Sequence, residues 1–192
     1  KCFYTWGTSR LTKQIKNCDY VYCETESQLL ECVLNYINRS SPDIISGWNS
    51  EGFDMPYIIN RSIKILGEDS IRKLSPVENI YSRMITGVFG KEQQRWYVSG
   101  VSCVDYLDVY KKFSVGLRES YKLDSIASLE LGEKKVDYGN TNLSALADDD
   151  WQLFVEYNVQ DVNLLVAMEE KLRYLELLRM LAYTGLTTIE SA

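Results

Sequence analysis

The order of patterned segments along the chain predicts an α/β fold. Over residues 19–48, a segment rich in aromatic and β-branched residues, an amphipathic segment with helical spacing and a short apolar segment follow one another, which is the strand, helix, strand order of α/β proteins. The 192 residues are 45% hydrophobic and 25% charged, close to the averages for soluble globular domains. The length corresponds to one domain, which we place at residues 1–185 with a tail at 186–192.

Strands are expected where aromatic and β-branched residues lie between turn residues. These segments are 1–8, 19–23, 43–48 and 79–106, the last divided by glycines into a hairpin and a core strand at 101–104. A polar connector joins the first two strands, which are expected to pair or to be neighbours.

Helices are expected where apolar residues recur at helical spacing behind capping residues. Thr25 and Gln28 form a capping box before a helix at 26–39, and Asp54 is expected to cap a helix at 55–66. Further helices are expected at 107–113, 122–131 and 151–183, the last with a break near 171–174 and with Gly185 as its final cap. Residues 140–150 are expected to be a loop.

The composition excludes several kinds of site. The histidine count is 0, which removes Ser-His-Asp and Cys-His nucleophiles and His-ligated zinc or haem, so catalysis would use carboxylates, Tyr, Lys or Cys. The five cysteines have no CxxC spacing and are interpreted as reduced. No apolar run approaches the length of a membrane span, and the N-terminus lacks the layout of a signal peptide. We therefore expect a soluble, cytoplasmic protein with no membrane partner.

The charge is unevenly distributed along the chain. The net charge is -6, the wrong sign for simple electrostatic capture of nucleic acid. Residues 60–95 nevertheless carry seven basic and four acidic side chains, whereas residues 137–192 carry three basic and ten acidic ones. A basic middle and an acidic end leave room for a polyanion on one face or a cation site on another.

Asp54 is the first candidate site residue. It follows the strand at 43–48, and α/β folds place their chemistry at the carboxyl ends of strands. An ordinary helix cap would also explain an Asp at this position, and the two roles are compatible because a cap can also bind a metal.

Tyr157 and Asp161 are the second candidate. Their four-residue spacing on the long helix puts the phenol and the carboxylate on one face, one turn apart. Such a pair can hold a metal and orient a water. A buried Tyr beside a solvated Asp explains the same spacing, so the pattern alone leaves both interpretations open.

The two patterns taken together resemble a known family. An Asn-x-x-x-Phe-Asp-x-Pro segment at 49–56 and a Tyr-x-x-x-Asp pattern at 157–161 are similar to the second and third exonuclease motifs of family B DNA polymerases. Further runs extend the resemblance over residues 43–185 to the proofreading domains of T-even-type bacteriophage DNA polymerases; they are Gly47-Trp48-Asn49, Pro56-Tyr57-Ile58, the run at 105–113 and Leu123-Asp124-Ser125-Ile126-Ala127.

The resemblance implies a ribonuclease H-like exonuclease fold, with a mixed central sheet flanked by helices, that removes misincorporated nucleotides from the 3′ end of single-stranded DNA. It implies two divalent ions, Mg²⁺ or Mn²⁺, for phosphodiester hydrolysis. By this resemblance Asp54 and Asp161 are metal ligands, with carboxyl groups within roughly 8 Å of each other, and Tyr157 positions the attacking water. Asn49 and Phe53 would lie near the terminal nucleotide, and Lys135 near the scissile phosphate. Basic residues would form a path for the strand; they are Arg61, Lys111, Lys112, Lys134 and Lys135.

The sequence departs from the family at its first motif. The family's D-x-E strand should precede residue 1, so the fold is expected to lack its first strand and half of the metal ligands. We therefore expect a fragment that is inactive by itself and whose partners include the polymerase domains of a longer parent chain. Glu24-Thr25-Glu26 is the nearest substitute, but acidic residues in the first turn of a capped helix already favour the macrodipole.

Two other functions remain open. The chain could be a catalytically inactive ribonuclease H-like module used for protein contact or scaffolding, although a scaffold has no reason to retain Asp54, Tyr157 and Asp161. It could also be a free-standing exonuclease that acts on RNA, with the same ligands. The polymerase-like intervening sequence argues against this last function.

Overall fold

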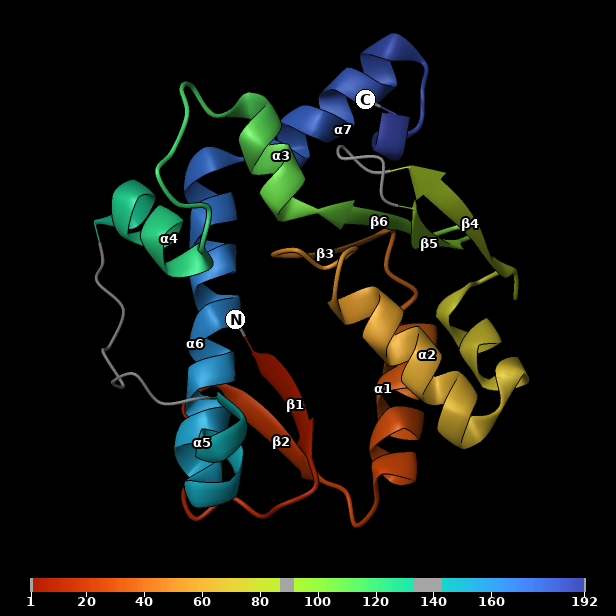
Figure 1. Cartoon of the computed structure of the whole chain (residues 1–192), viewed down its shortest axis with the longest axis vertical. Coiled ribbons are helices and arrows are strands. Elements are labelled where there is room, and N and C mark those ends of the chain that lie inside the picture. Colours follow the sequence, from red (N-terminus) through yellow and green to blue (C-terminus); the bar gives the residue numbers. More distant parts are fainter. Residues whose placement is uncertain (1, 87–91, 133–142, 192) are drawn as a thin grey trace. The chain divides into compact units, whose positions relative to one another are not determined.

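The structure, a computed structural model, describes residues 2–86, 92–132 and 143–191 (Figure 1). The chain forms two compact units, each built from two separate stretches of sequence. Unit 1 comprises residues 1–29 and 116–173, and unit 2 comprises residues 30–115 and 174–192. No helix among the described residues is long and apolar enough to cross a membrane.

Unit 1, over the residues that the structure describes, combines a parallel strand pair with helices. Strands β1 (Phe3–Gly7) and β2 (Cys18–Tyr22) pair in parallel, from Phe3 opposite Cys18 to Gly7 opposite Tyr22. Helices α4 (Leu123–Leu131) and α5 (Leu143–Asp149) pack against the long helix α6 (Trp151–Leu172). Asp150 caps α6, because its carboxylate accepts a hydrogen bond from the backbone N–H of Leu153 at 3.0 Å.

Helix α1 (Glu26–Ser40) begins in unit 1 and continues into unit 2. The predicted capping box is present: Thr25 Oγ1 accepts a hydrogen bond from the N–H of Gln28 at 3.2 Å. The Gln28 side chain reaches back one residue further than expected, to the N–H of Glu24. The sequence prediction for this helix is confirmed to within one residue at its C-terminal end.

Unit 2 holds two further strand pairs. Strands β3 (Ile44–Gly47) and β6 (Ser102–Asp105) pair in parallel, from Ile44 opposite Ser102 to Gly47 opposite Asp105. Strands β4 (Ile80–Thr86) and β5 (Glu92–Val98) form the predicted antiparallel hairpin. In the described residues the strands form three separate two-stranded pairs rather than the expected single mixed sheet.

Helices complete unit 2. These are α2 (Asp54–Leu66), the 3₁₀ turn η1 (Glu68–Leu74), α3 (Tyr106–Phe113), α7 (Tyr174–Gly185) and the short turn η2 (Ile189–Ser191). One buried cluster joins Leu34 of α1 to Met55 and Ile59 of α2 and to Val98 and Val101. A second cluster joins Val104 and Val109 to Leu178 of α7.

Two sequence predictions about helix positions are wrong. Residues 143–149 form helix α5 rather than a loop, because Leu146 is buried in unit 1. Gly185 is the last residue of α7, and the left-handed position falls on Leu186, with φ of 51°. The N–H of Thr187 bonds to the carbonyl of Ala182, so a Schellman motif closes the helix one residue later than predicted.

Candidate active site

The Asp54 loop lies at the carboxyl ends of two parallel strands. Strands β3 and β6 end together, with Gly47 opposite Asp105, and residues 48–53 form the turn that leads from β3 into α2 (Figure 1). Carboxyl ends of parallel strands are where α/β proteins expose functional groups. The sequence prediction of a strand, a loop and a helix that starts near Asp54 is confirmed.

Asp105 holds this loop in place, although sequence reasoning gave it no role. Asp105 is 6% exposed, and its side chain accepts three backbone hydrogen bonds. Oδ1 accepts from the N–H of Asn49 at 2.9 Å and from that of Leu107 at 3.0 Å, and Oδ2 accepts from Glu51 at 3.3 Å. Burial raises the pKa of Asp105, and the backbone hydrogen bonds partly offset that rise. One carboxylate therefore caps α3 and ties down the loop.

The backbone of the loop is left-handed at Asn49. Asn49 has φ of 63°, in the left-handed region that Asn tolerates better than most residues. A Cβ at Gly52 would lie 2.7 Å from Oδ1 of Asn49, so a larger residue there would require the exposed Asn49 side chain to move. Asn49 is exposed, and its backbone, rather than its side chain, makes the contact with Asp105.

Asp54 is the first residue of α2 and does not cap it. The predicted cap is wrong: Phe53 occupies the N-cap position and makes no side-chain cap bond. A cap at Asp54 would accept from the N–H of Pro56 or Tyr57, but Pro56 has no N–H and that of Tyr57 bonds to the carbonyl of Phe53. Desolvation raises the pKa of Asp54, and the charge of Asp105 raises it further. A cation beside this carboxyl would relieve both effects.

An ion pair links the loop to the hairpin. Nη2 of Arg95, in β5, donates a hydrogen bond to Oε1 of Glu51 at 2.6 Å and forms an ion pair with Oε2 of the same carboxylate. The side chains of Arg95 and Glu51 are 33% and 19% exposed. Burial raises the pKa of Glu51, and the Arg95 charge opposes that rise. Neither residue was singled out from the sequence, because an ion pair between positions 44 residues apart leaves no local pattern.

An aromatic surface flanks the loop. Phe53 is 64% exposed and stacks on Tyr57 of α2, with ring centroids 6.1 Å apart and planes 14° apart. These rings border a shallow cavity that is also lined by Asn60, Arg61 and Lys64. Stacked aromatic rings beside cationic side chains are the surface that single-stranded nucleic acids use. Tyr57 and Lys64 add to the predicted Phe53 and Arg61.

Tyr157 and Asp161 lie on α6 in unit 1, and both side chains are partly buried. The four-residue spacing therefore does fall within one continuous helix, as predicted. Asp54 belongs to unit 2, so a common site for Asp54 and Asp161 stays a prediction. Lys135 and Lys134 lie outside the described residues.

Of the Asp54 and Asp105 carboxylates, that of Asp54 suits a hard divalent cation. Asp54 offers carboxylate oxygens of the kind Mg²⁺ prefers, whereas the Asp105 oxygens already accept backbone hydrogen bonds. Within residues 2–86, 92–132 and 143–191, no three acidic or cysteine side chains gather closely enough to form a complete metal site. Asp54 therefore fits the role of one ligand rather than of a finished site.

The chain is similar to a known protein family and to individual polymerases. Residues 6–126 match the family model described as DNA polymerase family B, exonuclease domain. The chain is 34% identical over 164 residues to the DNA-directed DNA polymerase of Enterobacteria phage T4, covering 85% of this chain and 18% of that protein. It is 33% identical over 172 residues to the DNA-directed DNA polymerase of Escherichia phage RB69, covering 90% of this chain and 19% of that protein.

A more distant relative is the DNA polymerase of Autographa californica nuclear polyhedrosis virus, 25% identical over 161 residues. The chain spans about a fifth of the length of the two phage proteins that it matches. The family model covers the Asp54 loop, while Tyr157 and Asp161 lie beyond its matched residues.

Proposed function

Because the chain belongs to the exonuclease domain family of family B DNA polymerases, we propose that it is the part of a longer polymerase that removes nucleotides from the 3′ end of single-stranded DNA. The observation that supports this function best is the exposed first turn of α2, where Asp54 follows two parallel strand ends and its carboxyl is not used as a cap. The ribonuclease H-like fold and the partnership with polymerase domains of the same parent chain are parts of the same proposal.

In this proposal Asp54 and Asp161 hold a common divalent ion, Mg²⁺ or Mn²⁺. A bound ion would supply Lewis-acid stabilisation to the phosphodiester that is cleaved. Tyr157, one helical turn before Asp161, orients the attacking water through its phenol. Phe53 and Tyr57 stack against the terminal bases, and Arg61 and Lys64 attract the backbone phosphates. Lys135 has the proposed role of contacting the scissile phosphate.

Asp105 and Glu51 position the loop rather than touch the substrate. The three backbone hydrogen bonds to Asp105 fix where the loop leaves β3, and the Arg95 ion pair fixes Glu51 at its middle. Catalysis by placed groups loses rate steeply when those groups shift by about 1 Å. The loop therefore needs this support if Asp54 is to meet a second carboxylate at a common ion.

The test measures Mn²⁺ binding rather than nuclease activity, because the isolated chain is itself predicted to be a poor nuclease. Free Mn²⁺ is measured by electron paramagnetic resonance as it is added to the wild-type chain and to Asp54→Asn, Asp161→Asn and the double variant. We expect each single variant to bind Mn²⁺ about tenfold more weakly or worse, and the double variant to be no weaker than a single one, since a common ion is lost once.

Asp69→Asn is the matched control, because Asp69 has an exposed carboxylate, paired with Arg72, outside the loop. Variants that bind Mn²⁺ like the control, or losses that add in the double variant, would refute a common ion. The same result would favour the alternative of a catalytically inactive module used for protein contact.

A further inference from the structure

The connector between β1 and β2 is the most basic part of unit 1. Residues 8–17 carry Arg10, Lys13 and Lys16 and no acidic side chain, in a chain whose net charge is -6. Parallel strands are usually joined by a helix. Here an irregular segment makes the crossover, so its side chains and backbone remain near the face of β2 that it covers.

Side-chain hydrogen bonds hold the connector in one conformation. Oε1 of Gln152, in the first turn of α6, accepts from the N–H and the hydroxyl of Thr12 and from the N–H of Lys13, at 3.1 to 3.2 Å. The Tyr20 hydroxyl donates to the carbonyl of Ser9 and accepts from Nε1 of Trp151 at 2.9 Å. A cleft beneath this segment is therefore formed before any ligand arrives, which lowers the entropic cost of binding.

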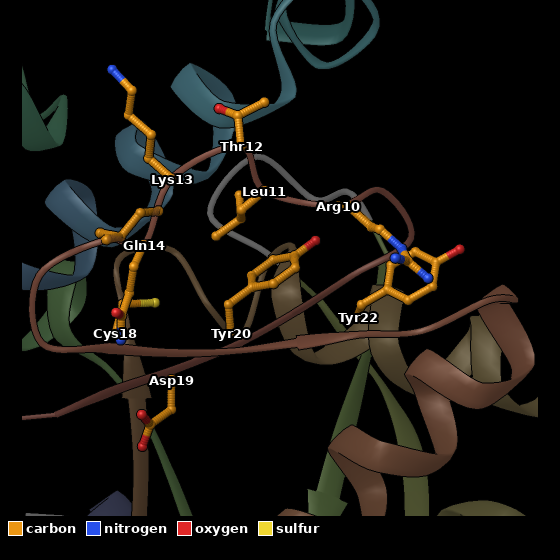
Figure 2. Close-up of a pocket in the computed structure, with 10 residues that line it drawn as sticks. Arg10, Leu11, Thr12, Lys13, Gln14, Cys18, Asp19, Tyr20 and Tyr22 are labelled. Atoms are coloured by element: carbon orange, nitrogen blue, oxygen red, sulfur yellow. The ribbon is translucent and has the colours of Figure 1, made fainter.

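The cleft has a volume of about 550 Å³ and combines cations with aromatic rings. Figure 2 shows Tyr20 and Tyr22 on the connector side of β2 and Asp19 on the opposite side, as the alternation of a strand requires. Arg10 lies over the Tyr22 ring, 5.0 Å from its centroid, at one end of the cleft, and Lys13 lies at the other. Asp19, the acidic residue among the described residues that line the cleft, thus points away from the cations.

The charges of Arg10 and Lys13 are available to a ligand. Over the part of the chain that the structure describes, neither side chain forms an ion pair. Arg10 lies over the Tyr22 ring as a cation–π contact, and the N–H groups at the edge of its guanidinium plane can donate to phosphate oxygens. The same plane, and the Tyr22 ring, which is 40% exposed, offer a surface on which a base can stack.

We propose that this connector cleft binds a phosphorylated nucleoside, either as a unit of a single nucleic acid strand or as a free nucleotide. Arg10 and Lys13 contact phosphate, and Tyr22 with Arg10 stacks on the base. An acidic peptide would use the two cations but would leave the aromatic surface without a partner, so the tyrosines favour a nucleotide.

The connector cleft is separate from the Tyr157 and Asp161 face of α6. Gln152, which anchors the connector, lies nine residues before Asp161, and nine steps of about 100° place the two side chains roughly 180° apart around the helix. A ligand in the connector cleft is therefore not the nucleotide whose phosphate Asp161 would face. The binding is independent of the proposed hydrolysis and does not require a metal.

The test uses the 192-residue chain, EDTA and a fluorescent circular oligo(dT), which has no 3′ terminus to enter the proposed exonuclease site. We expect Lys13→Ala to weaken binding and to lower the slope of log affinity against log salt by about 0.7, the contribution of one phosphate contact in a single strand. Lys16→Ala is the matched control, because it removes the same charge from the same connector but Lys16 does not line the cleft.

Two further variants separate stacking from charge. Tyr22→Leu should weaken binding by about fivefold or more without changing the salt slope, the range expected for loss of one stacked base. Arg10→Lys keeps the charge and loses the planar stack, so it should also bind more weakly. The fold of every variant is checked by near-ultraviolet circular dichroism, which reports on the packing of Trp151 and the other aromatic side chains.

Two other ligands complete the test. If Lys13→Ala and Tyr22→Leu weaken the binding of dTMP as much as that of the circle, the cleft recognises a single nucleotide unit. Tighter binding of dTMP would then identify a free nucleotide as the ligand, and tighter binding of the circle would identify a nucleic acid strand. If oligoglutamate of equal charge displaces the circle as well as dTMP does, or if Lys13→Ala and Lys16→Ala behave alike, the proposal is wrong. If the chain binds the circular oligo(dT) but Asp54→Asn and Asp161→Asn bind Mn²⁺ like the control, the proposed exonuclease site is refuted and the proposed connector cleft is not.

Discussion

Replacing Asp105 tests whether one carboxylate holds the candidate active site together. Asp105→Ala leaves three backbone N–H groups, those of Asn49, Glu51 and Leu107, without an acceptor. Loss of a helix cap costs about 1 kcal/mol, and each bond to a charged acceptor contributes about 1.5 kcal/mol or less after water has replaced it in part. The expected loss in the free energy of unfolding is therefore about 3 to 4 kcal/mol.

Asp105→Asn should cost less, about 1 to 1.5 kcal/mol. Its remaining carbonyl oxygen can still accept from Asn49 and Leu107, while its amide nitrogen would face the N–H of Glu51, so only that bond is lost. The assay is urea unfolding followed by tryptophan fluorescence, with Asp108→Ala as control because Asp108 is exposed in the same helix and pairs only loosely, at 3.4 Å, with Lys111. If Asp105→Ala lies within about 0.5 kcal/mol of that control, the hydrogen bonds to Asp105 do not hold the loop.

Three other predictions follow from the same contacts. Burial raises the pKa of Asp105, so the folded chain keeps this proton to higher pH than the unfolded chain does. The free energy of unfolding should therefore fall as pH rises from about 4 through the raised pKa of Asp105. The urea midpoint of Asp105→Asn should fall less steeply over the same pH range. A double-mutant cycle of Arg95→Gln and Glu51→Gln should give a coupling free energy of about 1 kcal/mol, and additive losses would contradict a linked hairpin and loop. Gly7→Ala would place a Cβ 2.6 Å from the Trp151 ring and against the Tyr20 hydroxyl, and should cost about 1 to 3 kcal/mol in thermal or urea unfolding, whereas Gly185→Ala, whose nearest contact would be 3.6 Å, should cost less.

Local patterns predicted the helices and strands with few errors. The capping box at Thr25, the strand that ends at Gly47 and the break after Leu172 each depend on residues next to one another in sequence, and all are present. The errors arose where tertiary burial overrides local preference. Polar residues suggested a loop at 140–150, but burial of Leu146 in unit 1 provides the free energy for a short helix.

The candidate site was predicted only where a residue stands in a local motif. Asp54 and Phe53 follow a strand, so their positions could be read from the sequence. Asp105 also ends a strand and begins a helix, which is a signal that could have identified it as a cap, but its bonds to Asn49 and Glu51 reach back more than 50 residues. Contacts of that kind depend on the register of β3 against β6, which no local pattern specifies.

The division of unit 2 into two stretches of chain has a consequence for protein synthesis. Leu178 of α7 packs against Val104 and Val109, roughly seventy residues earlier in the sequence. A ribosome that adds about 5 to 20 residues per second needs roughly 4 to 14 s to make that interval. During this time β6 and α3 leave the ribosome without the helix that covers their apolar residues, and nascent chains stalled before α7 has emerged from the exit tunnel should be captured by chaperones more often than chains from which α7 has emerged.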